Sequence, residues 1–406
     1  MGSAYRGAAV IGQSGGPTNV INQSLIGALL EASKYPEITH FYGSLNGVDG
    51  ILKENFINLR AESLDNLEVI ARTPSSALRS VRKKPTEDEC HLIFENFRKH
   101  AVRYFFYVGG NDSAETAHII NEFAKDAQYE FHAFHIPKTI DNDLRETDHC
   151  PGYGSAARFV AMAFQGANLD NLSLPGVYIG VVMGRHAGFL TAASVLGKTQ
   201  KDDGPHLVYV PETDFDTDQF VADVEKVYKK YNRCVVAISE GVHDKSGTPT
   251  VQTLVGKVEK DSHGNVQLSG IGALGDRLAE LVKDRLKISR VRSDTFGYLQ
   301  RCFPTIISET DAVEARRVGE EAVRAAVRGQ YEGSVAIRRL GNDPYRVDYE
   351  IVELNKVAKA TVAMPRDFLD GTNWITEKFV EYALPLVGDL PELGRLANVS
   401  IVKVRK

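Results

Sequence analysis

The sequence predicts an α/β protein built from two doubly wound, mostly parallel sheet domains with a cleft between them. Two observations favour this fold class. Short apolar stretches such as "RYFFYV" (103–108) recur along the chain, each beside a Gly-rich or polar turn and a helical pattern. These stretches are continuously apolar rather than alternating, as expected of strands that helices cover on both faces. Ligands of such folds bind beyond the carboxyl ends of the strands.

Strand and helix patterns alternate from the N-terminus onward. The turn "GQSGGPTN" (12–19) follows the first strand, and Pro17 fits the first turn of the next helix. Ser113 is well placed to cap the helix that follows the strand at 103–108. We expect strands at residues 8–11, 103–108, 176–182 and 234–239, and helices at about 20–29, 114–127, 187–196 and 311–328.

These units form two groups along the chain. The first group covers residues 1–150, and the chain would return to it with the helix at about 311–330. The second group would cover residues 151–310. The C-terminal portion, residues 331–406, has no loop motif of its own, and we interpret it as an elaboration of the structure. The sequence therefore predicts two α/β domains and a C-terminal segment.

Composition excludes several classes of protein. A formal net charge of −5 over 406 residues argues against a general nucleic-acid binder. No stretch reaches the roughly 18 uninterrupted apolar residues that a membrane-spanning helix needs. The N-terminus lacks a charged region followed by an apolar one, and the four cysteines are widely spaced. We therefore expect a reduced, cytoplasmic protein with neither a nucleic-acid nor a membrane partner.

The first polar turn, "GQSGGPTN", could bind an anion. Gly15 and Gly16 leave the backbone open, so that N–H groups can approach a phosphate at a helix start. The turn lacks both G-x-G-x-x-G and the Walker pattern G-x-x-x-x-G-K-[ST]. This argues against a dinucleotide-binding fold and a P-loop kinase, although a tight turn without a ligand fits equally well.

Two later turns carry charged and metal-binding groups. In "VGGNDS" (108–113), Asn111 offers an oxygen that suits Mg²⁺, while Asp112 places a negative charge where an anion would come. In "PKTIDNDL" (137–144), a cation, a hydroxyl and two carboxylates follow an apolar stretch. A kinase needs a carboxylate to accept the proton of the substrate hydroxyl, and donors to hold the phosphoryl group. The alternatives are ordinary turn residues and a solvated acidic turn.

Three further strand ends carry groups that could bind a sugar phosphate, although each alone could be surface decoration. Arg185 lies in "VVMGRHAG" (181–188), and its planar guanidinium suits phosphate. Glu240, in "ISEG", could accept hydrogen bonds from sugar hydroxyls, while Tyr298 and Arg301 come together in "GYLQR". Together with the earlier turns, they indicate one large, phosphate-rich cleft.

The ordered set "GGPTNVIN", "GGNDS", "PKTIDND", "MGR", "SEG" and "GYLQR" resembles the 6-phosphofructokinase family over roughly residues 8–320. The pyrophosphate-dependent branch of the family looks most similar. The resemblance implies an active-site cleft between a phosphoryl-donor-binding domain, residues 1–150 with 311–330, and a fructose-phosphate-binding domain, residues 151–310. It also implies a homo-oligomer, either a dimer or a tetramer, because relatives complete the sugar pocket with a neighbouring subunit.

The resemblance also implies a role for individual residues. Asp141 would be the base that deprotonates the C1 hydroxyl of fructose 6-phosphate. Gly15 would contact the phosphoryl donor, and Arg82 would lie near the transferred group, with Arg79 as the alternative. The sugar phosphate would be bound by Thr139, Ile140, Asp141, Met183, Gly184, Arg185 and Glu240, and its 6-phosphate end by Tyr298, Leu299, Gln300 and Arg301.

Two departures from the ATP-using pattern concern the donor. ATP-using relatives have "GGDGS" and "PGTIDND", so Asp112 and Lys138 each replace a glycine. Asp112 would occupy the place of the α-phosphate of ATP, and Lys138 would meet the charge of pyrophosphate. Two like charges about 4 Å apart repel by roughly 4 kcal/mol at an effective dielectric of 20. Repulsion of that size weakens binding about a thousandfold, which favours pyrophosphate over ATP.

The implied reaction is reversible transfer of a phosphoryl group from pyrophosphate to fructose 6-phosphate, giving fructose 1,6-bisphosphate and phosphate. Mg²⁺ would be the cofactor, with Asn111 standing where relatives have an aspartate beside the ion. Asp141, Asp112 and Lys138 are the expected catalytic residues. Open alternatives are an ATP-dependent enzyme, a kinase of another sugar phosphate such as sedoheptulose 7-phosphate, and a non-catalytic sugar-phosphate sensor.

Overall fold

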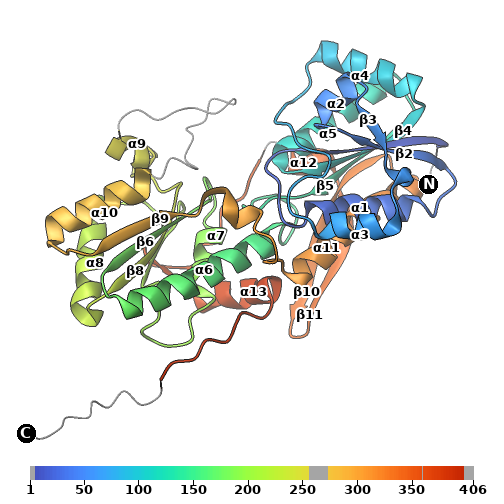
Figure 1. Ribbon diagram of the computed structural model, residues 1–406. Coiled ribbons are helices and arrows are strands. Elements are labelled where there is room, and N and C mark those ends of the chain that lie inside the picture. The colour runs from blue at the N-terminus through green and yellow to red at the C-terminus, as the bar shows by residue number, and fades with distance from the viewer. Residues whose placement is uncertain (1–4, 256–272, 359, 397–406) are drawn as a thin grey trace, which may run out of the picture.

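The computed structural model describes residues 5–255, 273–358 and 360–396, and its two main sheets lie in separate lobes (Figure 1). The larger sheet has seven strands, of which the two edge strands run antiparallel to their neighbours. In order, the strands are β11 (Tyr345–Val352), β10 (Glu332–Asn342), β5 (His132–Pro137), β4 (Val102–Gly109), β1 (Gly7–Gln13), β2 (Ile38–Ser44) and β3 (Phe56–Asn58).

Helices cover both faces of the larger sheet (Figure 1). Every residue of the central strands β1 and β5 is buried, which explains the continuous apolar pattern of parallel strands. One face packs against α1 (Ile21–Ala32), α3 (Leu64–Arg72) and α11 (Glu309–Val327), and the other against α2 (Val48–Leu52), α4 (Glu87–Lys99), α5 (Asn111–Asp126) and α12 (Leu354–Val357). A short 3-10 helix, η1 (Leu59–Ala61), follows β3.

The helix predicted at 311–328 is confirmed as α11, and it packs closely on α1. A Cβ atom on Gly319 would lie 2.2 Å from the carbonyl oxygen of Ser24, so the two backbones meet where a larger residue could not fit. Arg324 then forms a hydrogen-bonded ion pair with Glu31, with 2.9 Å between Nε and Oε1. A helix that comes late in the sequence thus covers the sheet that the N-terminus begins.

The smaller sheet has four strands, and all of its pairings are parallel. Their order is β7 (Leu207–Tyr209), β8 (Cys234–Ser239), β6 (Val177–Val182) and β9 (Val291–Thr295). One face packs against α6 (Tyr153–Ser173), α7 (Phe189–Ala192), η2 (Ala193–Val195) and α13 (Glu377–Val387), and the other against α8 (Thr217–Tyr231), α9 (Thr250–Val255) and α10 (Ala273–Leu286). The predicted fold class, two mostly parallel α/β sheets, is confirmed.

The C-terminal segment contributes to both sheets. β10 and β11 extend the larger sheet, whereas α13 packs on α6 beside the smaller one. Between them lie η4 (Arg366–Phe368) and a small antiparallel pair, β12 (Leu369–Asp370) with β13 (Trp374–Ile375). The division of the chain at residues 150, 310 and 330 stays a prediction.

Three local predictions were wrong. The first helix begins at Ile21, so Pro17 lies in the preceding loop. Ser113 does not cap α5, because that helix begins at Asn111 after Gly110, and Ser113 is buried inside its first turn against Gly109. The helix expected at 187–196 is only the short α7 followed by η2.

Two predictions from composition can be compared with the structure. Among the residues described, no helix combines the length and the apolar character that crossing a bilayer requires. All four cysteines lie in the described part of the chain, and each is a free thiol.

Candidate active site

The predicted site residues follow the carboxyl ends of strands in both sheets. In the larger sheet, the strands that come after β1 in sequence lie on opposite sides of it, with β2 on one side and β4 on the other. Ligands of open α/β sheets bind at such a switch point. The turns after β1 and β4, which contain Gly15 and Asn111, therefore flank the expected binding position.

The turn after β1 is held by Ser80 and Val81. Gly15 has a φ of 75°, which glycine adopts without strain. Its N–H donates to the carbonyl of Val81 at 3.1 Å, and the Ser80 hydroxyl donates to the Gly15 carbonyl at 2.6 Å. The Gly15 amide is therefore already paired within the protein, which the sequence did not indicate.

Three cations gather at this turn. Lys138 is 3% exposed and its Nζ donates to the carbonyl of Gly16 at 2.6 Å. Burial lowers the pKa of Lys138 to about 7, and the charges of Arg301 and Arg82 act in the same direction. A Cβ atom on Gly16 would lie 2.5 Å from Nη1 of Arg301, so this guanidinium lies directly against the turn. The arrangement favours an anion.

Arg301 and Arg82 also act on each other. Burial lowers the pKa of Arg301, and the charge of Arg82 contributes to the shift. Arg79, the alternative in the sequence, lies in the same segment with a φ of 59°. The electrostatic contacts of Arg82 with Lys138 and Arg301 favour Arg82 as the arginine of the site.

The loop after β5 carries two carboxylates in a buried setting. Burial raises the pKa of Asp143 to about 7, and the neighbouring charge of Asp141 adds to the shift. Burial also raises the pKa of Asp141, whereas the charges of Lys138, Arg301, His186 and Arg185 oppose that rise. Lys138 follows a strand of the larger sheet and Arg185 a strand of the smaller one, and both charges act on Asp141. This carboxylate therefore lies where the loops of the two sheets meet.

Thr139 and Ile140 shape this loop. The Thr139 hydroxyl accepts the Asp141 N–H at 3.1 Å, and the Thr139 N–H donates to the carbonyl of Pro151. Ile140 is buried in the apolar core beside the smaller sheet. Both residues therefore fix the backbone on the N-terminal side of Asp141.

The turn after β4 holds a second ion cluster, at the surface. Asn111 is the first residue of α5, and Asp112 follows it with a side chain that is 61% exposed. Oδ1 of Asp112 lies 2.9 Å from Nζ of Lys84, which also lies 2.5 Å from Oε2 of Glu115. Lys84 was not among the site residues predicted from the sequence, although the basic run "RKK" after Val81 was a signal. Asp112 is therefore not an isolated negative charge.

Two glycines allow the loops of the smaller sheet to approach each other closely. Gly184 has a φ of 140°, and its carbonyl accepts the Ser239 hydroxyl at 2.6 Å. A Cβ atom on Gly241 would lie 2.2 Å from the carbonyl oxygen of Arg185. Glu240, which lies between Ser239 and Gly241 in the chain, is 6% exposed. Arg185 and Glu240 are thus brought onto neighbouring loops.

The 3-10 helix η3 (Gly297–Arg301) is tied to the β6 loop. Gln300 is fully buried, and its Oε1 accepts the Met183 N–H at 3.2 Å. The guanidinium of Arg301 stacks on the ring of Tyr298, 4.5 Å from the centroid. Tyr298 and Leu299 are both about half exposed. Because the charges of Arg185 and Arg301 both act on Asp141, the loop after β6 and η3 lie near the loop that carries this carboxylate.

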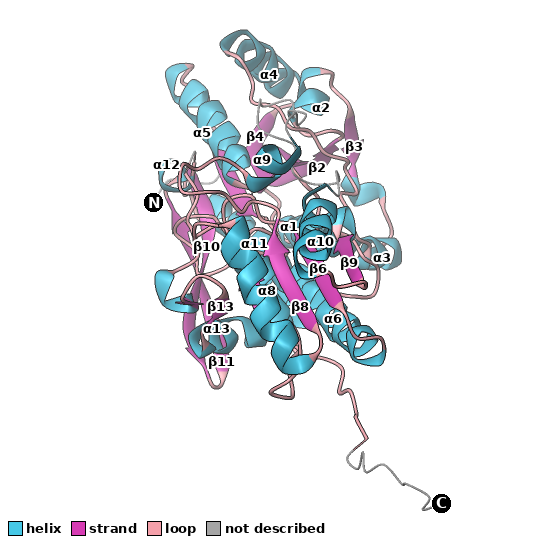
Figure 2. Ribbon diagram, turned by 90° about the vertical axis from the view of Figure 1, so that its left-hand side faces the viewer, coloured by secondary structure: helices cyan, strands magenta, loops and turns pink. Residues whose placement is uncertain are grey.

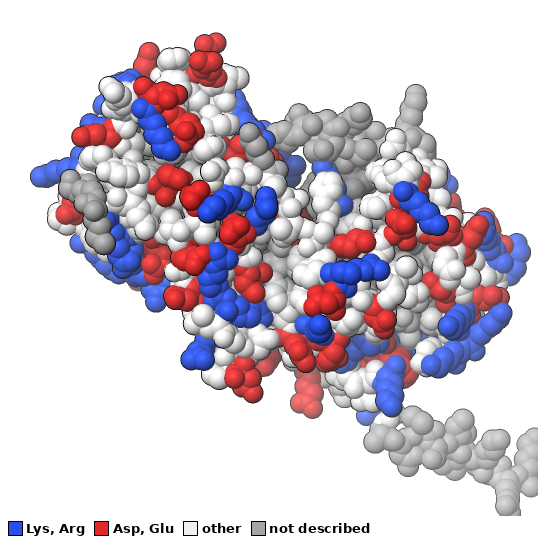
Figure 3. Space-filling view, turned by 180° about the vertical axis from the view of Figure 1, so that it is seen from behind, with Lys and Arg blue, Asp and Glu red and all other residues white. Residues whose placement is uncertain are grey.

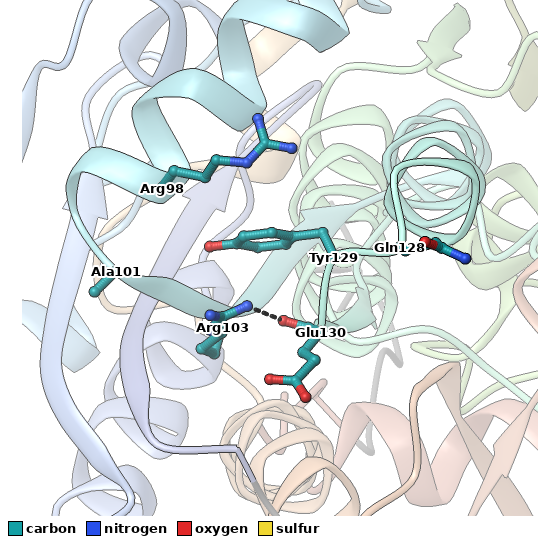
Figure 4. A pocket seen from close by; sticks show the side chains of 6 residues that line it. All are labelled: Arg98, Ala101, Arg103, Gln128, Tyr129 and Glu130. Atoms are coloured by element: carbon teal, nitrogen blue, oxygen red, sulfur yellow. Dashed lines mark hydrogen bonds between the residues drawn. The ribbon is translucent and has the colours of Figure 1, made fainter.

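A separate hollow lies near the amino ends of β4 and β5 (Figure 4). It has a volume of about 520 Å³. The ring of Tyr129 forms part of its lining and lies between the side chains of Arg98 and Arg103. The Arg103 guanidinium donates to the backbone of Glu130 at 3.0 Å. None of the predicted site residues lines this hollow.

The described part of the chain contains few groups of candidate metal ligands. No three His, Cys, Asp or Glu side chains there lie close enough together to hold a metal ion by themselves. Asp141 and Asp143 are neighbouring carboxylates with raised pKa values, a setting that a divalent cation would relieve. An ion at this position would need further oxygen ligands from a substrate or water.

Known proteins resemble this chain over nearly its whole length. A curated protein of Rhodospirillum rubrum named pyrophosphate–fructose 6-phosphate 1-phosphotransferase is 53% identical over 402 residues, which is 98% of this chain and 99% of the relative. A protein of the same name from Halomonas elongata is 37% identical over 96% of each chain. Crystal structures of pyrophosphate-dependent phosphofructokinases from Nitrosospira multiformis and Marinobacter aquaeolei superpose with TM-scores of 0.84, both at 32% identity.

These two structures are matched over nearly the whole length of both partners. The match covers 97% of this chain and 94% of the Nitrosospira protein, and 98% of each for Marinobacter. The family profile described as "Phosphofructokinase" matches residues 8–326. This chain belongs to the phosphofructokinase family.

Proposed function

We propose that this protein transfers a phosphoryl group reversibly from pyrophosphate to the C1 hydroxyl of fructose 6-phosphate. The products are fructose 1,6-bisphosphate and phosphate. The observation that carries the proposal is the convergence of Lys138, Arg82 and Arg301 on the turn after β1, beside the partly buried Asp141. Relatives that match the full chain are named for this reaction.

Asp141 is the proposed general base. Its buried position raises its pKa, and the surrounding cations keep the carboxylate available as a proton acceptor. Phosphoryl transfer needs little else from the protein than positioning and neutralisation of charge. Lys138, whose pKa is about 7 without a ligand, would take up a proton as the anionic donor binds. Gly15 and Arg82 complete the donor side.

The second set of loops is the proposed sugar-phosphate site. Thr139, Ile140, Met183, Gly184, Arg185 and Glu240 would surround the sugar, and Tyr298, Leu299, Gln300 and Arg301 its 6-phosphate. Gln300 supports this assignment because it anchors η3 to Met183. Arg301 reaches Gly16 while stacking on Tyr298, so its guanidinium lies between the donor turn and the sugar loops.

Asp112 is the proposed donor gate, with Lys84 as its partner. The carboxylate would take the place of the α-phosphate of ATP, so that only the shorter pyrophosphate fits. The ion pair with Lys84 and the exposure of Asp112 reduce the repulsion that an isolated buried charge would exert. Discrimination between the donors should therefore be smaller than the thousandfold expected from a bare pair of charges.

The carboxylates Asp141 and Asp143 and the amide of Asn111 fit a magnesium ion that is held chiefly by the pyrophosphate oxygens. When bound, Mg²⁺ would neutralise charge on the phosphoryl oxygens. The residues of this chain would bind the donor, orient it and take the proton.

The protein is proposed to be a cytoplasmic homodimer or homotetramer without nucleic-acid partners. Lys and Arg are interspersed with Asp and Glu on the face seen in Figure 3, rather than gathered into a basic stripe. This distribution supports the expectation that nucleic acid is not a ligand.

An assay of the purified protein tests the reaction. With Mg²⁺ and fructose 6-phosphate, pyrophosphate should support turnover much better than ATP, and fructose 1,6-bisphosphate with phosphate should yield pyrophosphate. Sedoheptulose 7-phosphate serves as the competing acceptor. Turnover with ATP alone, or none in the reverse direction, would refute the proposal.

A further inference from the structure

The loop that carries Asp141 is held by a side chain from the far end of the chain. Asn142 has a φ of 59°, and its side chain is buried. Its Oδ1 accepts the Cys150 N–H, and its Nδ2 donates to the hydroxyl of Tyr382, both at 2.8 Å. Tyr382 belongs to α13, 240 residues further along the chain.

The same hydroxyl holds the other end of the loop. Tyr382 Oη donates to the backbone carbonyl of Asp148 at 2.9 Å. One oxygen thus connects Asn142 with Asp148, and the exposed residues Arg145 and Glu146 lie in the chain between these two positions. The hydroxyl thus closes the loop together with the direct bond between Asn142 and the Cys150 N–H.

Tyr382 itself has little freedom to move. The guanidinium of Arg339 lies 4.5 Å from the centroid of its ring and donates to its backbone carbonyl at 2.7 Å. Nε of Arg339 also donates to Oδ1 of Asp148 at 2.9 Å. The rings of Phe368 and Phe189 lie 5.2 and 6.1 Å from the tyrosine ring.

The contacts of Tyr382 connect elements that belong to different sheets. Arg339 comes from β10 of the larger sheet, and α13 packs beside the smaller one (both elements are labelled in Figure 2), and the contacts of Arg339 with Tyr382 join the two. Next to it, the Val362 N–H donates to the carbonyl of Asp143 at 2.8 Å. The C-terminal segment therefore contacts both residues that follow Asp141 in the chain.

We propose that Tyr382 is a positioning residue that holds the Asp141 loop in its reactive geometry through the side chain of Asn142. The inference rests on the proposed role of Asp141 as the base. A displacement of about 1 Å at a reacting group can cost up to roughly a hundredfold in rate. The C-terminal segment, which the sequence suggested was only an elaboration, would then support catalysis.

Tyr382→Phe tests this role, because it removes one hydroxyl and keeps the ring. We expect kcat to fall about tenfold, while KM for fructose 6-phosphate and for pyrophosphate stays within about twofold. Tyr209→Phe is the matched control: Tyr209 is 4% exposed, and its hydroxyl also has a partly buried partner, Asp223, at 2.9 Å. The control should lose similar stability and keep its kcat.

Asn142→Gly gives an independent arm of the test. Glycine tolerates the left-handed backbone of this position, so the variant removes the side chain without backbone strain. If Tyr382 acts through Asn142, the double variant should lose no more kcat than Asn142→Gly alone. Losses that multiply would overturn the proposal, as would a Tyr382→Phe enzyme with the kcat of Tyr209→Phe. A wild-type protein inactive with pyrophosphate would instead refute the proposed function.

Discussion

The carboxyl ends of the two sheets are built differently. At the larger sheet, charged side chains are buried close together, and Lys138 and Asp143 both have pKa values of about 7 as a result. At the smaller sheet, close backbone contacts predominate: Gly184 and Gly241 allow the loops after β6 and β8 to touch. The loops of the larger sheet are thus suited to chemistry that moves charge, and the loops of the smaller sheet to recognition by shape.

This difference indicates how the work is divided between the sheets. A transferred phosphoryl group needs cations and a proton acceptor whose charges respond to the ligand. A neutral sugar ring needs loops that stay in one place. Substitutions on the larger sheet should therefore change kcat and donor choice, and those on the smaller sheet should change KM for the sugar phosphate.

The largest effect is expected at the larger sheet. Asp141→Ser should lower kcat by about 10² to 10⁴, the usual contribution of a positioned base, with little change in either KM. Steady-state kinetics in both directions measure this. A variant that keeps near-full turnover would remove Asp141 from the role of base.

The stability of the folded protein should depend on pH through the side chain of His149. His149 is buried between Asp148 and Glu314, with 2.7 Å from Nδ1 to Oδ1 of Asp148 and 2.6 Å from Nε2 to Oε2 of Glu314. Burial alone would lower the pKa of His149, but the charges of Glu314 and Asp148 outweigh it and raise the pKa to about 9. The protonated imidazolium therefore stabilises the folded protein.

Because the folded pKa of His149 lies above the unfolded one, its contribution is complete below about pH 6.5 and is lost as the pH rises towards 9. The loss is on the order of 3 kcal/mol at most. Urea unfolding of wild type and His149→Gln at pH 6 and pH 9.5 measures it. The free-energy difference between the two proteins should shrink at the higher pH, and an equal difference at both pH values would contradict the assignment.

A smaller effect is expected at the smaller sheet. In Gly184→Ala, the new Cβ would lie 2.5 Å from the carbonyl oxygen of Ala187, in a backbone conformation with a φ of 140°. The loop must shift, so KM for fructose 6-phosphate should rise about tenfold while KM for pyrophosphate is unchanged. Gly166→Ala is the control, because a Cβ atom there meets nothing within 4 Å. Equal KM values in both variants would show that the Gly184 loop does not set sugar affinity.

The sequence predicted the parts of the fold and site that depend on local pattern. The buried strands β1, β4, β6 and β8 were found because parallel strands covered on both faces are continuously apolar. The start of α5 was misplaced because Ser113, a good cap by type, is instead buried against Gly109.

Contacts between distant residues could not be predicted in this way. The pairs Lys84–Asp112 and Asn142–Tyr382 form only when the chain has folded, and although the basic run at residues 82–84 is visible in the sequence, no local pattern shows which residues pair. The paired Gly15 amide is a further example, since its acceptor lies 66 residues along the chain on Val81.

The donor preference tests the central claim most directly. We would measure kcat/KM for pyrophosphate and for ATP with wild type, Asp112→Gly and Lys84→Met. The ratio of ATP to pyrophosphate efficiency should rise roughly ten- to a hundredfold in Asp112→Gly, since the charge that it removes is exposed and partly neutralised. In Lys84→Met the ratio should fall, because Asp112 loses its partner. An unchanged ratio in Asp112→Gly would contradict the donor gate.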